Sequence, residues 1–341
     1  GINVSVTILI SPSGGEEEVI IDGDPELVES EGESKYKVTL TRGKHDIVVK
    51  KKGYYLLEEL GRNIVKTETI ELNLNKAVRY TKGTPLAPTD SPMSIAGSGD
   101  DLFVANNGSK EVLHIGSDGG VKDRVSYEDL GVVTVTAIAV DGEVFVVADS
   151  KHNMVVMSSF DGDDINVVAH GNEPYGDKKL NNPSAIAASD GTYYIVDSSN
   201  KRVLYFEGAS YRTSFGSDVL KKPVGIELGE EGLVYVTDII DQSVVVFNSA
   251  RENEEAIKLD SQSTPSYIYK DSDGFFYIAD YVNNTIGKYT GELELLTIAS
   301  TDVASPRGLT LLGLGPDATM YVASKDKVSV LKGGWDNVYM P

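Results

Sequence analysis

The chain has 341 residues, no cysteine, and 52 acidic against 31 basic residues, which gives a formal net charge of −21. The lack of cysteine excludes disulfides, thiolate metal sites and cysteine nucleophiles, and the negative charge argues against nucleic acid and membrane surfaces as partners. With 34 glycines and 18 tyrosines, and no long apolar stretch of helical period or membrane-spanning length, the composition predicts an all-β fold.

Residues 1–78 are predicted to form a small β-sandwich. An alternating strand in GINVSVTILI at 1–10 is followed by a Ser-Pro-Ser-Gly-Gly turn, a second short strand that ends in Ile-Asp-Gly, and further alternation in KYKVTLTRGKHDIVVKKKGYY and TETIELNLNKAV. Through its Ser-Pro-x-Gly, Ile-Asp-Gly, RGKHDIVVKKKGY and ELNL segments, the region resembles PEGA-type β-sandwich modules. Such modules usually belong to surface or secreted proteins, so the resemblance implies an extracytoplasmic location.

Residues 79–92 are predicted to form a linker, because the segment YTKGTPLAPTDSP that begins at position 80 contains three prolines and proline-rich segments act as semi-rigid spacers. The linker also overlaps AVRYTK at 77–82, which has the alternation of a strand. It is therefore a candidate for closing the repeat array that follows.

From residue 93 to 341 the sequence is repetitive. Aromatic or β-branched runs end in FVAN at 103–106, VVAD at 146–149, YIVD at 194–197, YVTD at 235–238, YIAD at 277–280 and YVAS at 321–324, with spacings of 43, 48, 41, 42 and 44 residues. Six units of this length, each with three legible strands and room for a fourth, predict a six-bladed β-propeller. Closing the ring requires a covering strand, and AVRYTK at 77–82 and WDNVYM at 335–340 are the two candidates.

The third unit, NPSAIAASDGTYYIVDSSNKRVLYF at 182–206, resembles the NHL repeat family. It has that family's order of proline, apolar strand, Asp-Gly turn, Tyr-Ile-x-Asp, Asn-x-Arg and a final strand that ends in phenylalanine. The resemblance covers roughly residues 90–334 and implies a propeller fold. Some NHL propellers are lyases or amidating enzymes with a histidine-bound metal in the central channel, so the resemblance also implies an enzymatic alternative.

Aspartates end the second strand of four units: Asp149, Asp197, Asp238 and Asp280. An Asp side chain at such a position accepts a hydrogen bond from the backbone amide two residues on, so the first interpretation is a turn-forming role. The alternative is that these carboxylates share one rim of the ring and form a negative annulus that suits calcium. His170, in the long connection of the second unit, is the candidate ligand for a channel metal such as zinc.

Residues that follow the repeated prolines are predicted, by resemblance to propeller geometry, to lie near the mouth of the channel. Candidate ligand contacts among them are Met93, Ser184, Ser266 and Arg307. Arg307 is the one cation of the group, and two roles are open for it. It either neutralises nearby aspartates or orients a carboxylate or sugar ligand.

No contiguous motif for an activated nucleophile is present. We therefore interpret the chain as a non-enzymatic extracytoplasmic protein that needs no cofactor and whose propeller binds a protein or glycan partner, or helps to build a surface assembly. Self-association through the strand at 1–10 is a further hypothesis. The alternative interpretation is a lyase or hydrolase of NHL type that holds a calcium or zinc ion in the propeller channel.

Overall fold

The computed structural model describes residues 2–11, 13, 17–51, 57–73, 78–86, 89–259, 263–301, 303–313 and 318–335. Nearly all regular structure in these ranges is β-strand, beside the short turns η1 (Pro25–Leu27), η2 (Ser198–Asn200) and η3 (Glu230–Gly232). Among the described residues, no helix is long and apolar enough to cross a bilayer. The chain forms two compact units, Gly1–Arg79 and Tyr80–Gly333, and the all-β prediction is confirmed.

The first unit is a two-sheet sandwich around one apolar core. One sheet has the order β3-β4-β1-β7 and the other β2-β5-β6, with the bounds β1 (Asn3–Ser11), β2 (Glu17–Ile21), β3 (Val28–Gly32), β4 (Lys35–Thr41), β5 (Gly43–Lys51), β6 (Leu57–Ile64) and β7 (Glu68–Asn73). Alternation explains the core, because Val4, Val6, Ile8 and Ile10 of β1 all face inward. The predicted β-sandwich is present.

The second unit contains six four-stranded sheets. In chain order their strands are β9 (Pro92–Ser98), β10 (Asp101–Asn106), β11 (Glu111–Ile115), β12 (Val121–Ser126); β13 (Val135–Asp141), β14 (Val144–Asp149), β15 (Met154–Ser159), β16 (Asn166–His170); β19 (Pro183–Ser189), β20 (Thr192–Asp197), β21 (Arg202–Glu207), β22 (Ser210–Phe215); β23 (Pro223–Leu228), β24 (Val234–Asp238), β25 (Ser243–Phe247), β26 (Asn253–Lys258); β27 (Pro265–Lys270), β28 (Phe276–Asp280), β29 (Thr285–Tyr289), β30 (Leu295–Ser300); and β31 (Gly308–Leu312), β32 (Thr319–Ala323), β33 (Val328–Trp335), β8 (Val78–Lys82). A small hairpin, β17 (Pro174–Tyr175) and β18 (Lys178–Lys179), follows the second sheet.

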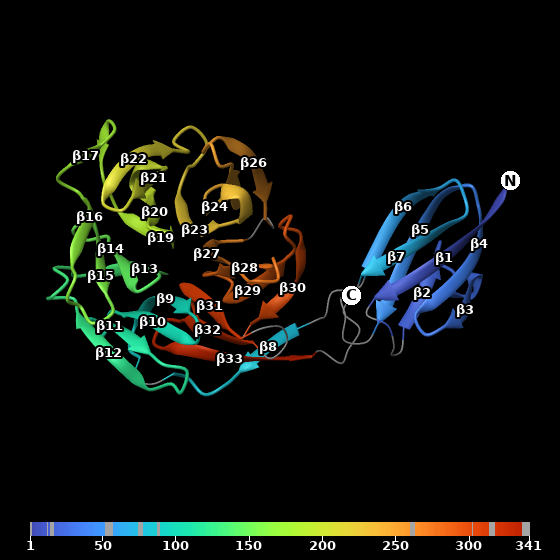
Figure 1. The fold of residues 1–341 in the computed structure, drawn as a ribbon, viewed down its shortest axis with the longest axis horizontal. Coiled ribbons are helices and arrows are strands. Elements are labelled where there is room, and N and C mark those ends of the chain that lie inside the picture. The colour runs from blue at the N-terminus through green and yellow to red at the C-terminus, as the bar shows by residue number, and fades with distance from the viewer. Residues whose placement is uncertain are drawn as a thin grey trace. The chain divides into compact units, whose positions relative to one another are not determined.

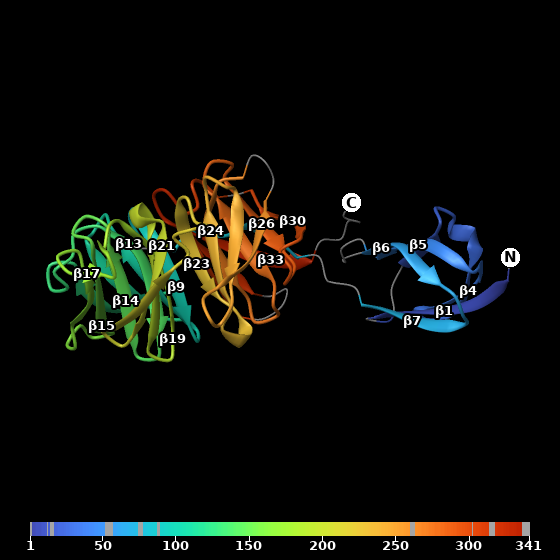
Figure 2. The same cartoon turned by 90° about the horizontal axis from the view of Figure 1, so that it is seen from above.

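These sheets form a closed β-propeller. The first strand of each sheet lies nearest the centre of the ring in Figure 1, and Figure 2 shows the sheets from the side. The inner strands contact one another in the order β9, β13, β19, β23, β27, β31, and β31 contacts β9 again. Apolar side chains fill the space between neighbouring sheets, as where Val146 of β14 and Ile195 of β20 share one core cluster.

The last sheet is completed by β8, which comes from the predicted linker, so AVRYTK supplies a closing strand. The segment after β8 continues the pairing, since the Gly83 amide donates to the Val330 carbonyl (2.7 Å) and the Leu86 amide to the Val328 carbonyl (3.1 Å). Tyr80 of β8 is buried, and its ring meets the Tyr277 ring edge-on at 6.2 Å. Of the other candidate, WDNVYM, only Trp335 lies within the described residues.

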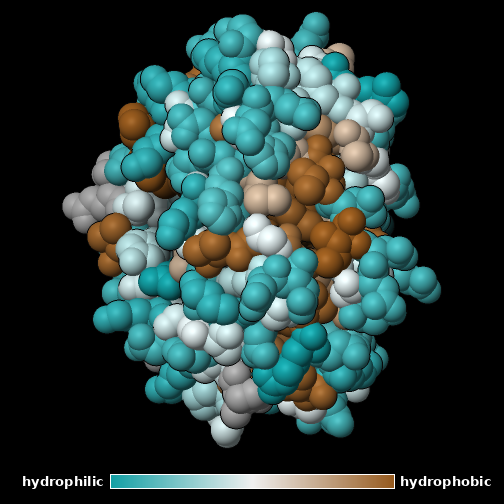
Figure 3. Space-filling view, turned by 90° about the vertical axis from the view of Figure 1, so that its left-hand side faces the viewer, coloured by the Kyte–Doolittle hydropathy of each residue, from teal (hydrophilic) through white to brown (hydrophobic). Residues whose placement is uncertain are grey.

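Figure 3 shows one face on which polar side chains surround a central band of apolar ones. Apolar side chains that remain exposed in the propeller include Ile165, Val167, Ile240 and Val282. Single exposed apolar residues are normal for a folded protein and carry no functional conclusion by themselves.

Candidate functional site

The repeated aspartates fasten the turns of their own blades. Each ends the second strand of a sheet and is buried. The carboxylates of Asp149, Asp238 and Asp280 accept backbone amides from two segments at once, whereas Asp197, among the described residues, accepts a backbone amide only from Asn181 and none from the turn that follows it. Asp238 shows the pattern: Oδ1 accepts from the amides of Ile240 and Asp241 in the following turn, and Oδ2 from those of Lys221 and Lys222, just before the inner strand. Equivalent bonds hold Asp149 and Asp280. The turn-forming interpretation agrees with this geometry.

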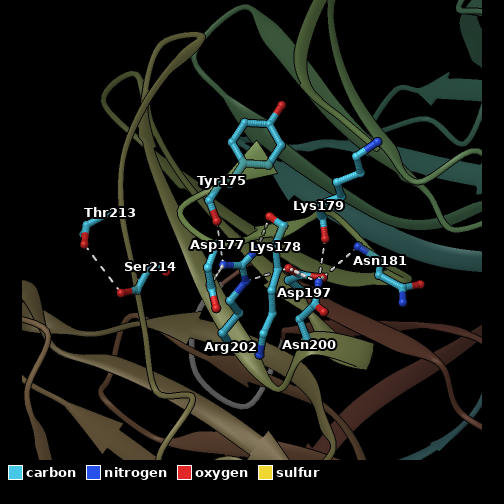
Figure 4. A network of polar contacts seen from close by, with 10 residues as sticks. All are labelled: Tyr175, Asp177, Lys178, Lys179, Asn181, Asp197, Asn200, Arg202, Thr213 and Ser214. Carbon is cyan, nitrogen blue, oxygen red and sulfur yellow. Dashed lines mark hydrogen bonds and ion pairs between the residues drawn. The ribbon is translucent and has the colours of Figure 1, made fainter. Parts of the chain in front are cut away.

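Asp197 is the centre of the most extensive of these networks (Figure 4). Its carboxylate accepts from the Asn181 amide (2.8 Å), the Asn200 side-chain amide (2.8 Å) and Arg202 Nε (2.8 Å). Arg202 is buried, and its two other nitrogens donate to the carbonyls of Tyr175 and Lys178. Because every donor and acceptor is matched inside the protein, this network holds the long connection between the second and third blades in place.

The structure does not bring the predicted metal ligands together. Among the described residues, no group of three or more His, Cys, Asp or Glu side chains is placed to hold a metal ion. Asp149, Asp197, Asp238 and Asp280 lie in separate blades with their oxygens engaged by amides, and His170 Nδ1 accepts from the Asn172 amide (3.0 Å). The negative annulus is therefore not formed by these residues.

Met93, Ser184 and Ser266 lie at the start of inner strands, Arg307 directly precedes β31, and all four are partly exposed. Their role as ligand contacts stays a prediction. Three hydroxyls in this ring join one blade to the next, by donating to the carbonyl of the proline that opens the following inner strand. Thr136 bonds to Pro183 (2.8 Å), Ser184 to Pro223 (3.4 Å) and Ser266 to Pro306 (2.9 Å). Arg307 makes the corresponding contact through Nη1 to Met93 Sδ (3.0 Å).

A carboxyl group that the sequence analysis missed lies further along an inner strand. Glu227 of β23 is half-buried. Its Oε1 accepts from the Leu228 amide (2.8 Å) and its Oε2 from the Lys270 amide of the neighbouring inner strand (3.2 Å). Burial raises the pKa of Glu227 to about 7, although both amides and the Lys270 charge act in the opposite direction. The carboxyl group therefore exchanges its proton near neutral pH.

Two tyrosines, Tyr267 and Tyr269, lie on the neighbouring inner strand β27. Burial raises the pKa of Tyr267, and the negative charge of Glu227 raises it further, so this phenol stays protonated and able to donate a hydrogen bond. Burial also raises the pKa of Tyr269, whose hydroxyl donates to the Leu311 carbonyl at 3.5 Å. A carboxyl group that exchanges its proton near neutral pH and a protonated phenol thus lie on adjacent inner strands, and groups with such shifted pKa values are common in active sites.

An alignment of the repeats contains the signal for this site. The position after the central Ile or Leu of each inner strand is occupied, in chain order, by Ala96, Ala139, Ala187, Glu227, Tyr269 and Thr310. The first three blades thus present a methyl group, whereas the last three present polar groups. Because alanine is sufficient at this position in three blades, the fold itself does not require the polar residues that the other three blades have there.

Comparisons with known proteins support the fold and correct the function. No family model and no curated protein matches the sequence. A streptogramin B lyase matches the structure with a TM-score of 0.56 and 16% identity, over 76% of this chain and 98% of that chain. Virginiamycin B lyase from Staphylococcus aureus matches with a TM-score of 0.54 and 16% identity, over 93% of this chain and 99% of that chain. A gluconolactonase from Xanthomonas campestris matches with a TM-score of 0.59 and 14% identity, over 75% of this chain and 95% of that chain.

The interpretation of the chain as a non-enzymatic binding or assembly protein is wrong by this comparison, because the similar propellers are named as enzymes. The sequence carries no motif for an activated nucleophile, and the groups considered from several blades were the aspartates and His170, not Glu227. In a propeller, reacting groups come from equivalent positions on separate blades, so they are close in space and distant in sequence. At these identities the likeness itself establishes the fold: the chain is a β-propeller with an N-terminal β-sandwich.

Proposed function

We propose that the protein is an enzyme, a lyase or hydrolase, that uses Glu227 for proton transfer in the propeller channel. The observation that carries this proposal is the half-buried carboxyl group of Glu227 on an inner strand, with a pKa of about 7. A general base is most effective when its pKa lies close to the pH at which it works. The neighbouring inner strand, β27, offers a protonated phenol, Tyr267, as a hydrogen-bond donor.

The same pair of groups supports two related reactions. In hydrolysis, ionised Glu227 takes a proton from water, the water oxygen bonds to an ester carbonyl carbon, and Tyr267 donates a hydrogen bond to the carbonyl oxygen. The ester carbon–oxygen bond then breaks, and protonated Glu227 returns its proton to the leaving alkoxide. In elimination, Glu227 takes a proton from carbon, a double bond forms and the carbon–oxygen bond to the leaving carboxylate breaks. Lactones and other cyclic esters are the substrate class we propose, since one similar structure is a gluconolactonase.

A channel metal, as the NHL resemblance implies, does not fit the described residues. The donor set around Glu227 consists of one carboxyl group and phenols, and no histidine of the described chain joins it. A catalytic zinc or calcium site needs at least three protein ligands of suitable type. The proposed reactions are therefore written through Glu227 and Tyr267 alone.

The test is the activity of Glu227→Gln beside a matched control. Wild-type protein is assayed with glucono-δ-lactone, aliphatic lactones and a streptogramin B, and product analysis in isotopically labelled water separates hydrolysis from elimination. We expect a rate that rises with pH through about 7 and a loss of roughly a hundredfold or more in kcat for Glu227→Gln. Glu254→Gln, which removes the same charge from the outer strand β26 of the same blade, keeps full activity. Equal activity of both variants would refute the role of Glu227.

The finer family assignments are also proposals. We infer that the blades are NHL repeats, which is supported by the joint contact of Asp197 with Asn200 and Arg202, and that the sandwich is a PEGA-like module. An extracytoplasmic location rests on that second resemblance and is tested by cell fractionation with an antibody to the chain. A surface protein or glycan partner, and self-association through the first strand, remain predictions from the sequence.

A further inference from the structure

The mouth of the channel carries one strong cation in an otherwise neutral ring. The six equivalent residues there are Met93, Thr136, Ser184, Val224, Ser266 and Arg307. Three of these side chains are hydroxyls that donate to carbonyls of the next blade. Met93 and Val224 have no side-chain donor at all, so the fold needs at most a short donor at this position, and an arginine with five N–H donors exceeds that requirement.

The Arg307 guanidinium is little used by the protein. Within the described residues, the one contact to it is from Nη1 to the Met93 sulfur (3.0 Å), and a thioether is a weak acceptor. The other described arginines of the propeller unit are each engaged by a carboxylate or an aromatic ring: Arg124 with Glu111, Arg202 with Asp197, Arg212 with Glu207 and Arg251 with Tyr205. Most N–H donors of the Arg307 guanidinium are thus left to bind a ligand.

Nearby carboxylates do not neutralise it. Asp197, Asp238 and Asp280 pair with the prolines that open their inner strands, so they lie at the same end of the ring as Arg307. Their oxygens accept backbone amides or side chains of their own blades. The net charge of −21 repels an anion that approaches the protein. Salt screens this repulsion at distances beyond about 8 Å, so direct contact with Arg307 determines the affinity for the anion.

Arg307 and Glu227 lie at different depths of one channel. Arg307 corresponds to Val224 in the repeat, three positions before Glu227 along the inner strand. At a rise of about 3.3 Å per residue, the two levels are about 10 Å apart along the strand. We propose, building on the function given above, that Arg307 binds a carboxylate of the substrate at the mouth while the bond to be broken lies at Glu227, so that the enzyme prefers elongated anionic esters.

The experiment compares charged and neutral esters of equal length. Para-nitrophenyl half-esters of dicarboxylic acids from succinate to sebacate are assayed against para-nitrophenyl esters of the corresponding fatty acids. We expect kcat/KM to favour the longer half-esters, and Arg307→Met to lower it for them by about tenfold or more, mainly through KM, as for a lost hydrogen bond to a charged group. The quantity compared is the preference for half-esters over neutral esters: Arg307→Lys retains part of this preference, and Arg212→Met, a control on the outer strand β22, retains all of it.

A binding measurement separates this inference from the function on which it rests. Calorimetric titration of suberate into Glu227→Gln protein, with and without Arg307→Met, needs no turnover. If wild-type protein cleaves none of the esters but suberate binds in an Arg307-dependent way, ester cleavage fails and the anion-selective mouth stands. If Arg307→Met keeps both the suberate affinity and the half-ester preference, the role of Arg307 is overturned, whatever the activity. A circular dichroism spectrum equal to that of wild type confirms that each variant is folded.

Discussion

Replacing Glu227 by glutamine is expected to stabilise the propeller at neutral and alkaline pH. The amide has the shape of the carboxyl group and its oxygen can still accept one of the amides of Leu228 and Lys270, but it has no charge to bury. The pKa of Glu227 is raised from its ordinary value of 4.5 to about 7, so folding favours its protonated form. Its contribution to stability is fully present below pH 4.5 and is lost as the pH rises through about 7.

The size of the effect follows from the same shift. At about 1.4 kcal/mol per pKa unit, the advantage of Glu227→Gln in the free energy of unfolding is about 1 kcal/mol near pH 5 and grows to about 3 kcal/mol near pH 8. Because the side chain is half-buried, solvent screening makes these values upper limits.

Denaturant unfolding of both proteins across this pH range measures the difference, with Glu254→Gln on the outer strand as the control. If the gain in unfolding free energy of Glu227→Gln does not grow with pH, or if Glu254→Gln shows the same gain, then burial of the ionised Glu227 carboxylate does not destabilise the protein. This result would also remove the main support for Glu227 as a base active near neutral pH.

Two further predictions concern the frame of the propeller. Asp197→Ala leaves the buried Arg202 guanidinium without its carboxylate, so we expect a loss of about 3 kcal/mol or more in unfolding free energy, whereas Asp177→Ala, at an exposed carboxylate 3.8 Å from the same arginine, costs little. Similar losses for both variants would contradict this. Tyr80→Ala removes the buried ring that meets Tyr277 and should cost about 3 kcal/mol. An unchanged thermal melt would mean that β8 does not close the ring in solution.

Sequence reasoning found those features that depend on local chemistry. Each blade repeats its own strand alternation and its own turn, so the repeated aspartates could be recognised as turn residues without the fold. The position of Arg307 beside the start of an inner strand could be recognised too, because Arg307 follows a repeated proline. The sequence of one repeat unit thus largely predicts the local structure of that unit.

Features that join different blades were harder to predict. AVRYTK and WDNVYM both alternate as strands do, and the pairing of β8 with β33, far apart in the chain, is a property of the closed ring. Glu227 was missed because a single Glu in a strand carries no motif. Its meaning emerges on comparison with Ala96, Ala139 and Ala187 at the equivalent positions of the first three blades.

The closing strand also sets the order in which the propeller can be completed. β8 is synthesised before the first blade, and its partner β33 is synthesised last. During translation the early blades leave the ribosome with open strand edges, and β8 has no partner until Val328–Trp335 emerges. A nascent chain that stalls before that point therefore carries an unclosed, aggregation-prone ring, so cellular yield should depend on how quickly the final blade is made and captured.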